Sequence, residues 1–212
     1  MNNQKEHLDN LSEIRSLMEK SSRFLSLSGV SGISAGIIAI IGVTAASIYQ
    51  GYSFFERTKV TNLLKPEGGI NMDFMLFFSI DAIIVIILAL STSVFFTMRK
   101  AKKRKLPVWE SSAKRLVWSL SVPLATGGVF CLVLLRYSLV FLIAPSMLIF
   151  YGLSLTNAGK YTHNEVTVLG IFEILIGIFA LFFIGYGMLF WVIGFGLFHI
   201  IYGTFMYYKY ER

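Results

Sequence analysis

Charged residues are scarce in this chain and nearly missing from six long stretches of it. Asp, Glu, Lys and Arg make up 15% of the 212 residues, against about 25% in an ordinary soluble domain, and the mean hydropathy is +0.67. The charges gather in short clusters between the apolar stretches. This distribution argues against a water-soluble globular domain and favours a protein whose solvent is lipid.

Residue types that build disulfide, metal and catalytic sites are also few. Cys131 is the one cysteine, so no disulfide framework is expected. His7, His163 and His199 are scattered, without the spacing of a metal site. No phosphate loop, GxSxG or HExxH motif occurs. We therefore expect no metal, no cofactor and no enzymatic activity.

Six apolar stretches predict an all-α, polytopic membrane protein, because a helix needs about 20 apolar residues to cross the hydrocarbon core. The predicted spans cover residues 24–49, 74–98, 116–135, 139–155, 166–184 and 188–207. Residues 136–138 alone separate spans 3 and 4, and residues 185–187 alone separate spans 5 and 6. We therefore expect the six-helix domain, residues 24–212, to consist of three helical hairpins.

The loops indicate an orientation through their basic residues. Of the 19 Lys and Arg residues, 15 fall on one side if the loop after span 2 is cytoplasmic. The N- and C-termini are then cytoplasmic, in a bacterial inner membrane. The basic cluster of this loop is expected to contact anionic lipid headgroups rather than nucleic acid. Its members are Arg99, Lys100, Lys102, Lys103, Arg104 and Lys105.

Residues 1–22 are polar and amphipathic, which predicts a short cytoplasmic helix and no signal peptide. Such a helix could lie on the membrane surface, cover the cytoplasmic mouth of the bundle, or pair with a second copy of the chain. A homo-oligomer is therefore left open as a partner beside the lipid bilayer.

Small residues predict where the helices approach one another, since close packing drives helix association in lipid. Gly32 and Gly36 form such a face on span 1, and Gly170 and Gly177 form one on span 5. We expect these four glycines to lie at helix contacts.

A weak internal repeat runs through the spans. The pair Tyr151-Gly152 of span 4 recurs 51 positions later as Tyr202-Gly203 in span 6. Span 1 resembles span 5 at an offset of 141 positions. Both matches are consistent with repeated hairpin units.

Three ionisable residues lie inside the apolar stretches: Asp81, Glu173 and His199. A charge at the centre of a span costs at least ~2.5–3.5 kcal/mol, so each needs a partner or water. Glu173 lies 13 residues before Tyr186 in the last turn, and His199 lies 13 residues after it. Equal rise per residue puts both at the same depth, which predicts a Glu–His pair. Asp81 lies nearer the outside, where Arg136 could reach it.

Two hypotheses follow from these polar residues. In the first, the pairs only fix helix packing, and the protein is a non-enzymatic membrane protein that acts through partner contacts, with a role in envelope stress. In the alternative, Glu173, His199 and Asp81 serve a small proton-coupled transporter or channel.

Residues 169–187, LGIFEILIGIFALFFIGYG, contain the pattern Gly-Ile-x-x-Ile-x-x-Gly-Ile-x-Ala-Leu at positions 170–181. This stretch is similar to repeats of the HdeD-like acid-resistance membrane proteins. The resemblance implies a bacterial inner-membrane protein with six helices built from hairpins. It implies no catalytic residues.

Overall fold

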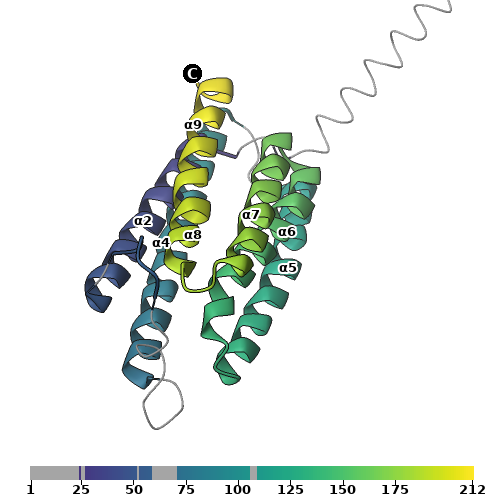
Figure 1. Cartoon of the computed structure of the whole chain (residues 1–212). Coiled ribbons are helices and arrows are strands. Elements are labelled where there is room, and N and C mark those ends of the chain that lie inside the picture. The colour runs from purple at the N-terminus through teal and green to yellow at the C-terminus, as the bar shows by residue number, and fades with distance from the viewer. Residues whose placement is uncertain (1–23, 25–26, 52, 59–70, 106–108) are drawn as a thin grey trace, which may run out of the picture.

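The computed structural model describes residues 24, 27–51, 53–58, 71–105 and 109–212, and its regular elements are all helical (Figure 1). Six helices or runs of helix are long and apolar enough to cross a membrane, by length and composition. An all-α chain with six candidate spans is therefore confirmed. The amphipathic helix expected at residues 1–22 lies outside the described residues.

The first three spans are single helices and the fourth and sixth are composite. The first three are α2 (Gly29–Gln50), α4 (Met72–Lys103) and α5 (Ser111–Arg136). The fourth combines the short η1 (Val140–Leu142), α6 (Ile143–Ala158) and η2 (Gly159–Tyr161). The fifth is α7 (Asn164–Phe182), and the sixth combines α8 (Gly187–Trp191), the π-helix η3 (Val192–Phe198) and α9 (His199–Tyr210).

The second helix is longer than its apolar stretch. α4 continues past Met98 to Lys103, so the first part of the basic cluster is helical rather than loop. Its last turn contains Lys100, Lys102 and Lys103. Cations at this position are favourable, because the helix C-terminus carries a partial negative charge.

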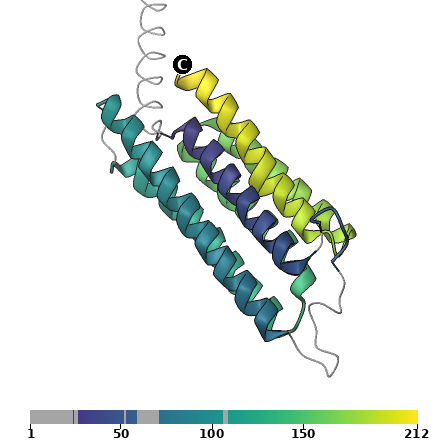
Figure 2. The same cartoon turned by 90° about the vertical axis from the view of Figure 1, so that its left-hand side faces the viewer.

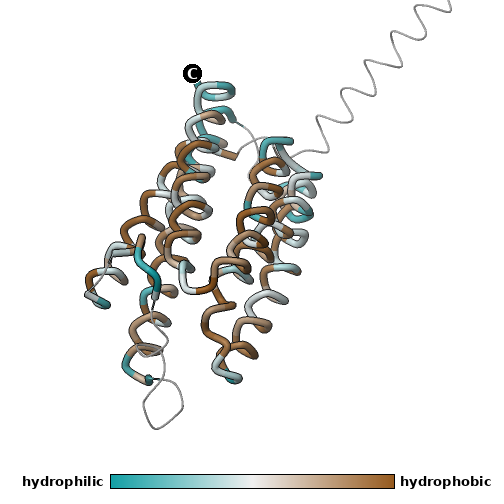
Figure 3. The backbone as a smooth tube through the Cα atoms, viewed as in Figure 1, coloured by the Kyte–Doolittle hydropathy of each residue, from teal (hydrophilic) through white to brown (hydrophobic). Residues whose placement is uncertain are grey.

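The helices consist mainly of apolar residues along their middle and of more polar residues toward the two ends of the bundle (Figure 3). Ile83 and Ile87 of α4 are each 56% exposed, and Leu132 of α5 is 66% exposed. Such large apolar faces are unfavourable in water. They fit a protein whose outer surface contacts lipid tails.

The helices form two groups that meet along one seam. α2 packs between α4 and α9 (Figure 2), and α6 packs between α5 and α7. The two groups meet where α7 contacts η3 and α9, and where α6 contacts α8. The seam therefore lies between the fifth and sixth spans and includes the π-helix.

The contact between α2 and α9 depends on glycines. A Cβ built on Gly29 would lie 2.5 Å from the carbonyl oxygen of Gly203, and one on Gly36 would lie 3.1 Å from the amide of Ile200. Gly32 would meet the Cα of Gly203 at 3.0 Å. The two backbones are thus too close for any larger residue at Gly29 or Gly36.

The contact between α6 and α7 has the same construction. A Cβ on Gly170 would lie 2.7 Å from the carbonyl oxygen of Gly152, and one on Gly177 would lie 3.0 Å from the amide of Ile149. These four residues are related to Gly29, Gly203, Gly36 and Ile200 by the offsets of 141 and 51 positions. The sequence repeat therefore corresponds to a repeated helix interface in space.

The turn between α7 and α8 contains Gly185 at φ +98°, a conformation that a residue with a side chain rarely adopts. The segment that follows α2 closes over this turn. The Arg57 Nε donates to the Ile184 carbonyl at 3.1 Å, and the Thr58 amide donates to the Gly185 carbonyl at 2.9 Å.

Candidate functional site

Three polar side chains from three spans meet in the interior of the bundle. Glu173 lies in the middle of α7 and is 0% exposed, and His199 begins α9 and is 6% exposed. The Nδ1 of His199 lies 3.4 Å from Oε1 of Glu173, and its Nε2 lies 2.7 Å from the hydroxyl of Tyr151 on α6. The structure thus brings together the two residues that equal spacing from Tyr186 placed at one depth. We call Glu173, His199 and Tyr151 the triad.

Hydrogen bonding assigns the tautomer of His199. Its Nδ1 lies 3.1 Å from the carbonyl oxygen of Gly194. A carbonyl can only accept, so Nδ1 carries the hydrogen of the neutral ring and Nε2 is the acceptor. Tyr151 therefore donates its hydroxyl hydrogen to Nε2. The ring thus directs its N–H to the Gly194 carbonyl and its lone pair to the Tyr151 hydroxyl, and Nδ1 lies beside Glu173 without a hydrogen bond to it.

The π-helix η3 makes room for this arrangement. A Cβ on Gly194 would collide with Leu148 and lie 2.5 Å from Oε2 of Glu173. The glycine lets the carboxyl approach the sixth span closely. π-Turns are rare within helices and are frequent at functional sites.

Glu173 is buried without full hydrogen bonding. Neither of its carboxyl oxygens has a hydrogen-bond donor within the described part of the chain, because the Nδ1 hydrogen of His199 points to Gly194. Burial of a polar group in this state costs free energy, and burial of an unpaired charge costs far more. A proton on Glu173 removes the charge of the buried carboxylate, and a proton on His199 supplies an opposite charge beside it. Either proton would therefore change the free energy of the buried site strongly.

Apolar side chains close the triad on the side of the α7–α8 turn. Leu148, Ala180 and Phe190 form a buried cluster there, with Ile176, Tyr186 and Phe195 packed against it. Phe195 also lies with its ring centroid 5.1 Å from that of Tyr151. On the opposite side, toward the C-terminus of the chain, the neighbouring apolar cluster contains a further polar side chain, Tyr202.

Asp81 belongs to a different environment. Its carboxyl oxygens lie 3.6 and 3.7 Å from the position that a Cβ on Gly42 of α2 would take. Of the ion pairs among the described residues, none joins Asp81 to Arg136. The expected Asp81–Arg136 contact is therefore wrong, because α4 presents Asp81 to α2 while Arg136 is exposed at the end of α5.

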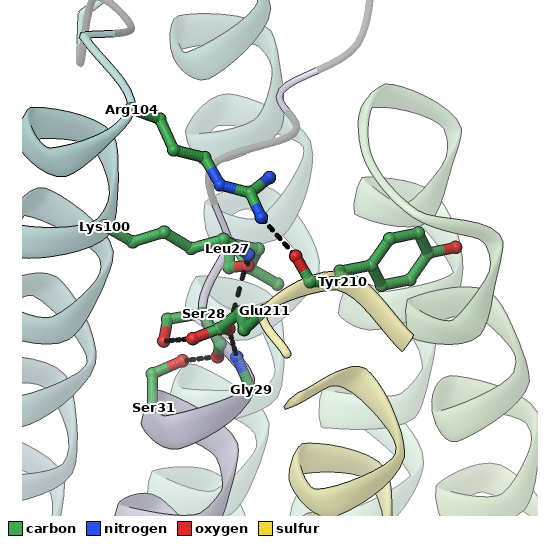
Figure 4. A network of polar contacts seen from close by, with 8 residues as sticks. All are labelled: Leu27, Ser28, Gly29, Ser31, Lys100, Arg104, Tyr210 and Glu211. Carbon is green, nitrogen blue, oxygen red and sulfur yellow. Dashed lines mark hydrogen bonds and ion pairs between the residues drawn. The ribbon is translucent and has the colours of Figure 1, made fainter. Parts of the chain in front are cut away.

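A polar network at the C-terminal end of the bundle ties the last residues to α2 and α4 (Figure 4). Glu211 Oε1 accepts from the amide of Gly29 at 2.5 Å and from Lys100 Nζ at 3.3 Å. The Ser28 hydroxyl donates to the other carboxyl oxygen at 3.3 Å. Glu211 thus caps the free amide at the start of α2, a position that favours a carboxylate. We call this group of contacts the tail network.

The tail network changes the interpretation of the basic cluster. Lys100 is 8% exposed and also donates to the Leu27 carbonyl, and Arg104 donates to the Tyr210 carbonyl. The expectation that all six basic residues contact lipid headgroups is wrong for Lys100, because its charge is buried and paired with Glu211. Arg99, Lys102, Lys103, Arg104 and Lys105 are exposed.

A second polar cluster lies at the same end, on the other side of α9. Glu165 at the start of α7 accepts from Lys209 Nζ at 2.5 Å and from the Tyr210 hydroxyl at 3.0 Å. The ring of His163 lies 4.2 Å from that of Tyr210. Lys209 is exposed, so this group reaches the surface. We call Glu165, Lys209, Tyr210 and His163 the surface cluster.

Sequence reasoning treated Tyr151 and Tyr202 only as markers of the repeat and Gly194 only as a packing residue, and it did not single out Glu211. The hydroxyls of the two tyrosines were a usable signal, since both recur in the interior of apolar spans. Among the described residues, no group of three or more His, Cys, Asp or Glu is placed to hold a metal.

Comparison of the chain with models of protein families, with curated proteins and with solved structures finds no match. The similarity of residues 169–187 to the HdeD-like proteins stays a prediction.

Proposed function

We propose that this is a multi-pass protein of a bacterial inner membrane, with the C-terminal end of the bundle in the cytoplasm. In support, α4 ends there in exposed Arg99, Lys102 and Lys103. Basic residues are enriched on the cytoplasmic side of membrane proteins. A reporter fused to the C-terminus that is active only in the cytoplasm should be active, and activity of a periplasm-specific reporter would contradict this orientation.

The building units in this proposal are three helical hairpins: α2 with α4, α5 with α6, and α7 with the α8–α9 run. Packing of α2 on α4 and of α5 on α6 supports the first two units. The tight turn at Gly185 supports the third, although α7 packs more extensively on α6 than on α9. A relation to the HdeD-like family would account for such units.

The proposed activity is proton-coupled transport, with the triad as the proton-binding site. The observation that supports it is the fully buried carboxyl of Glu173, which has no hydrogen-bond donor among the described residues and lies 3.4 Å from a histidine. Packing does not require an acid here, since α2 and α9 achieve an equally close contact with glycine alone. An intramembrane acid next to an imidazole is typical of proton-handling sites.

Burial favours a transporter over an open channel. Glu173 is 0% exposed and His199 is 6% exposed, so in this conformation bulk solvent does not reach the carboxyl. Proton exchange then requires a relay or an opening movement. The seam between the two helix groups passes through the triad, which would couple a proton on Glu173 to movement along that seam.

Infrared difference spectroscopy on the purified protein in liposomes tests proton binding. A buried protonated carboxyl should give a band that titrates with pH and is lost in Glu173→Gln. The control variant Asp73→Asn, at an exposed residue of the first turn of α4, should keep it. A wild-type spectrum without a band that depends on Glu173 would contradict the proposal.

Transport itself is tested in liposomes that contain a pH-sensitive dye and are exposed to a panel of small ions and osmolytes. A solute that moves protons through the wild type and through Asp73→Asn should fail with Glu173→Gln. Equal proton movement by wild type and Glu173→Gln with every solute would overturn transport. The remaining hypothesis would then be a non-enzymatic protein that acts through helix packing and partner contacts.

A further inference from the structure

The two helix groups are held together differently at the two ends of the seam. One group consists of α2, α4 and the α8–α9 run, and the other consists of α5, α6 and α7. At the end away from the C-terminus, residues 183–186 alone connect α7 to α8. Such a short segment spans at most about 14 Å when fully extended. The groups therefore cannot separate far at this end, and the α7–α8 turn can serve as a pivot.

At the C-terminal end, polar side chains of opposite groups meet across the seam. Glu165 at the start of α7 accepts from Lys209 Nζ at 2.5 Å and from the Tyr210 hydroxyl at 3.0 Å, and both donors lie on α9. Lys209 is exposed to solvent. Exposed ion pairs contribute little stability, because water can replace each partner. The surface cluster is therefore a contact that can open and close.

Phe24 makes a second contact across the seam at this end. Its amide donates to the Tyr161 carbonyl and its carbonyl accepts from the Thr162 hydroxyl, each at 2.7 Å. These partners lie between α6 and α7, whereas α2, which begins at Gly29, belongs to the other group. Phe24 is 7% exposed and Thr162 is 0% exposed. We call the contacts of Phe24 with Tyr161 and Thr162 the Phe24 bridge.

An apolar cluster between these contacts and the triad is built from both groups. Leu155, Val166 and Leu169 of one group form its buried part. Leu27, just before α2, packs against it from the other group, and Tyr151 of the triad packs against it as well. Separation of the groups at the C-terminal end would divide this cluster and uncover the triad from that side.

The tail network does not cross the seam. Glu211 binds the amide of Gly29 and the ammonium of Lys100, so it joins the end of α9 to α2 and α4 within one group (Figure 4). Arg104 binds the Tyr210 carbonyl within the same group. These three helices can therefore move as one body while the contacts of the surface cluster break.

We infer that the surface cluster and the Phe24 bridge form a gate at the C-terminal end of the seam. Release of the gate lets the two groups separate there, with the α7–α8 turn as the pivot, and water then reaches Glu173 from that side. This inference rests on the proposed function, since it assigns the side and the movement through which the proton-binding site exchanges its proton.

The test joins the two sides of the gate in the purified protein, in a Cys131→Ala background. Glu165→Cys and Lys209→Cys are linked by a short bis-methanethiosulfonate reagent, whose disulfide bonds a reducing agent removes. Infrared spectroscopy follows the band of protonated Glu173 after transfer into heavy water. The cross-link should slow the deuterium shift of this band at least about tenfold, because it prevents the opening that admits solvent. Reduction should restore the original rate.

A cross-link at the pivot is the matched control. Arg57→Cys and Ile184→Cys place the same reagent where the Arg57 Nε donates to the Ile184 carbonyl at 3.1 Å. Because the groups need not separate at this end, the exchange rate of the Glu173 band should stay unchanged.

A single substitution should have the opposite effect on the gate. Thr162→Val removes the hydroxyl that holds Phe24 and keeps the shape of the side chain. Loss of one hydrogen bond from the closed state should speed the exchange about fivefold. Thr126→Val is its control, since that hydroxyl bonds only to the Val122 carbonyl of its own helix, and it should exchange at the wild-type rate.

An equal rate before and after reduction of the Glu165–Lys209 cross-link, with the Glu173 band present, would overturn the gate and leave the proposed function standing. Slower exchange with the Arg57–Ile184 cross-link, alone or to the same degree, would also overturn it. An unchanged rate in Thr162→Val would overturn the part assigned to the Phe24 bridge. A wild-type spectrum without a band that depends on Glu173 would instead contradict the proposed function itself.

Discussion

The α2–α9 and α6–α7 interfaces have equivalent close glycine contacts but differ at a central position. α2 has Gly32 beside the ring of Tyr202, whereas the equivalent position of α7, 141 residues later, is Glu173. Glu173 in turn lies 3.4 Å from His199, which is hydrogen-bonded to Tyr151, the counterpart of Tyr202. The α2–α9 interface shows that this packing needs no acid. The acid in the α6–α7 interface is therefore an addition to the packing, which supports the proposed role of Glu173 in proton binding.

The two interfaces also differ where their helices begin. Gly29 is the first residue of α2, while its counterpart Gly170 lies in the interior of α7, which begins at Asn164. The amide of Gly29 therefore has no preceding helical turn whose carbonyl could accept its hydrogen bond, whereas Gly170 follows such a turn in α7. Glu211 supplies an acceptor in its place, and Lys100 balances the charge.

The largest effect is expected from breaking the α6–α7 contact. Gly170→Leu would push a side chain into the backbone of Gly152 and Thr156. It should lower the free energy of unfolding by about 3 kcal/mol or more. Equilibrium unfolding in mixed detergent micelles measures this. Gly128→Leu, where a Cβ meets nothing within 4 Å, should change it little, and equal losses in both variants would contradict the glycine contact.

Loss of the capping at the start of α2 should have the next largest effect. Lys100→Met leaves Glu211 without its buried cation and should lower the free energy of unfolding by about 2 kcal/mol. Lys102→Met removes an exposed lysine of the same turn and should leave it within about 0.5 kcal/mol. If the same unfolding assay gave equal values for both, the tail network would be a surface contact only.

The central position can be compared directly. Glu173→Met removes a buried ionisable group and should raise the free energy of unfolding by about 1–2 kcal/mol. Gly32→Ala, at the equivalent site of the other interface, should lower it by about 1 kcal/mol, because the methyl group meets the Cα of Gly203 at 3.0 Å. A destabilised Glu173→Met variant would mean that the acid is mainly a structural tie.

The smallest effect is expected from removing the hydroxyl of Tyr151 or of Tyr202, and it should differ between the two. Tyr151→Phe loses the hydrogen bond to His199 and should lower the free energy of unfolding by about 1 kcal/mol. Tyr202→Phe removes a hydroxyl that has no hydrogen-bond partner among the described residues, and it should leave the free energy of unfolding unchanged or slightly raised. Thermal unfolding followed by circular dichroism can rank the two variants, and the reverse ranking would indicate that Tyr202 is the structural hydroxyl.

Spacing along the chain was sufficient to predict the central contact of the site. Equal distances from Tyr186 placed Glu173 and His199 at one depth, and the structure puts them 3.4 Å apart. The same reasoning failed for Asp81 and Arg136, because depth does not specify which neighbour a helix face meets. The inference from the basic cluster failed for Lys100, because this lysine is buried and paired with Glu211 near the end of the chain.

The sequence by itself determined the six apolar helices, their approximate ends and the height of each polar residue. These are local properties, since apolar length and rise per residue need no neighbour. Only the tertiary structure decided that Tyr151 holds His199, that Gly194 admits the carboxyl of Glu173, and that Glu211 caps α2. Those contacts depend on how helices rotate about their axes and which of them pack together, which is set by the fit of their surfaces.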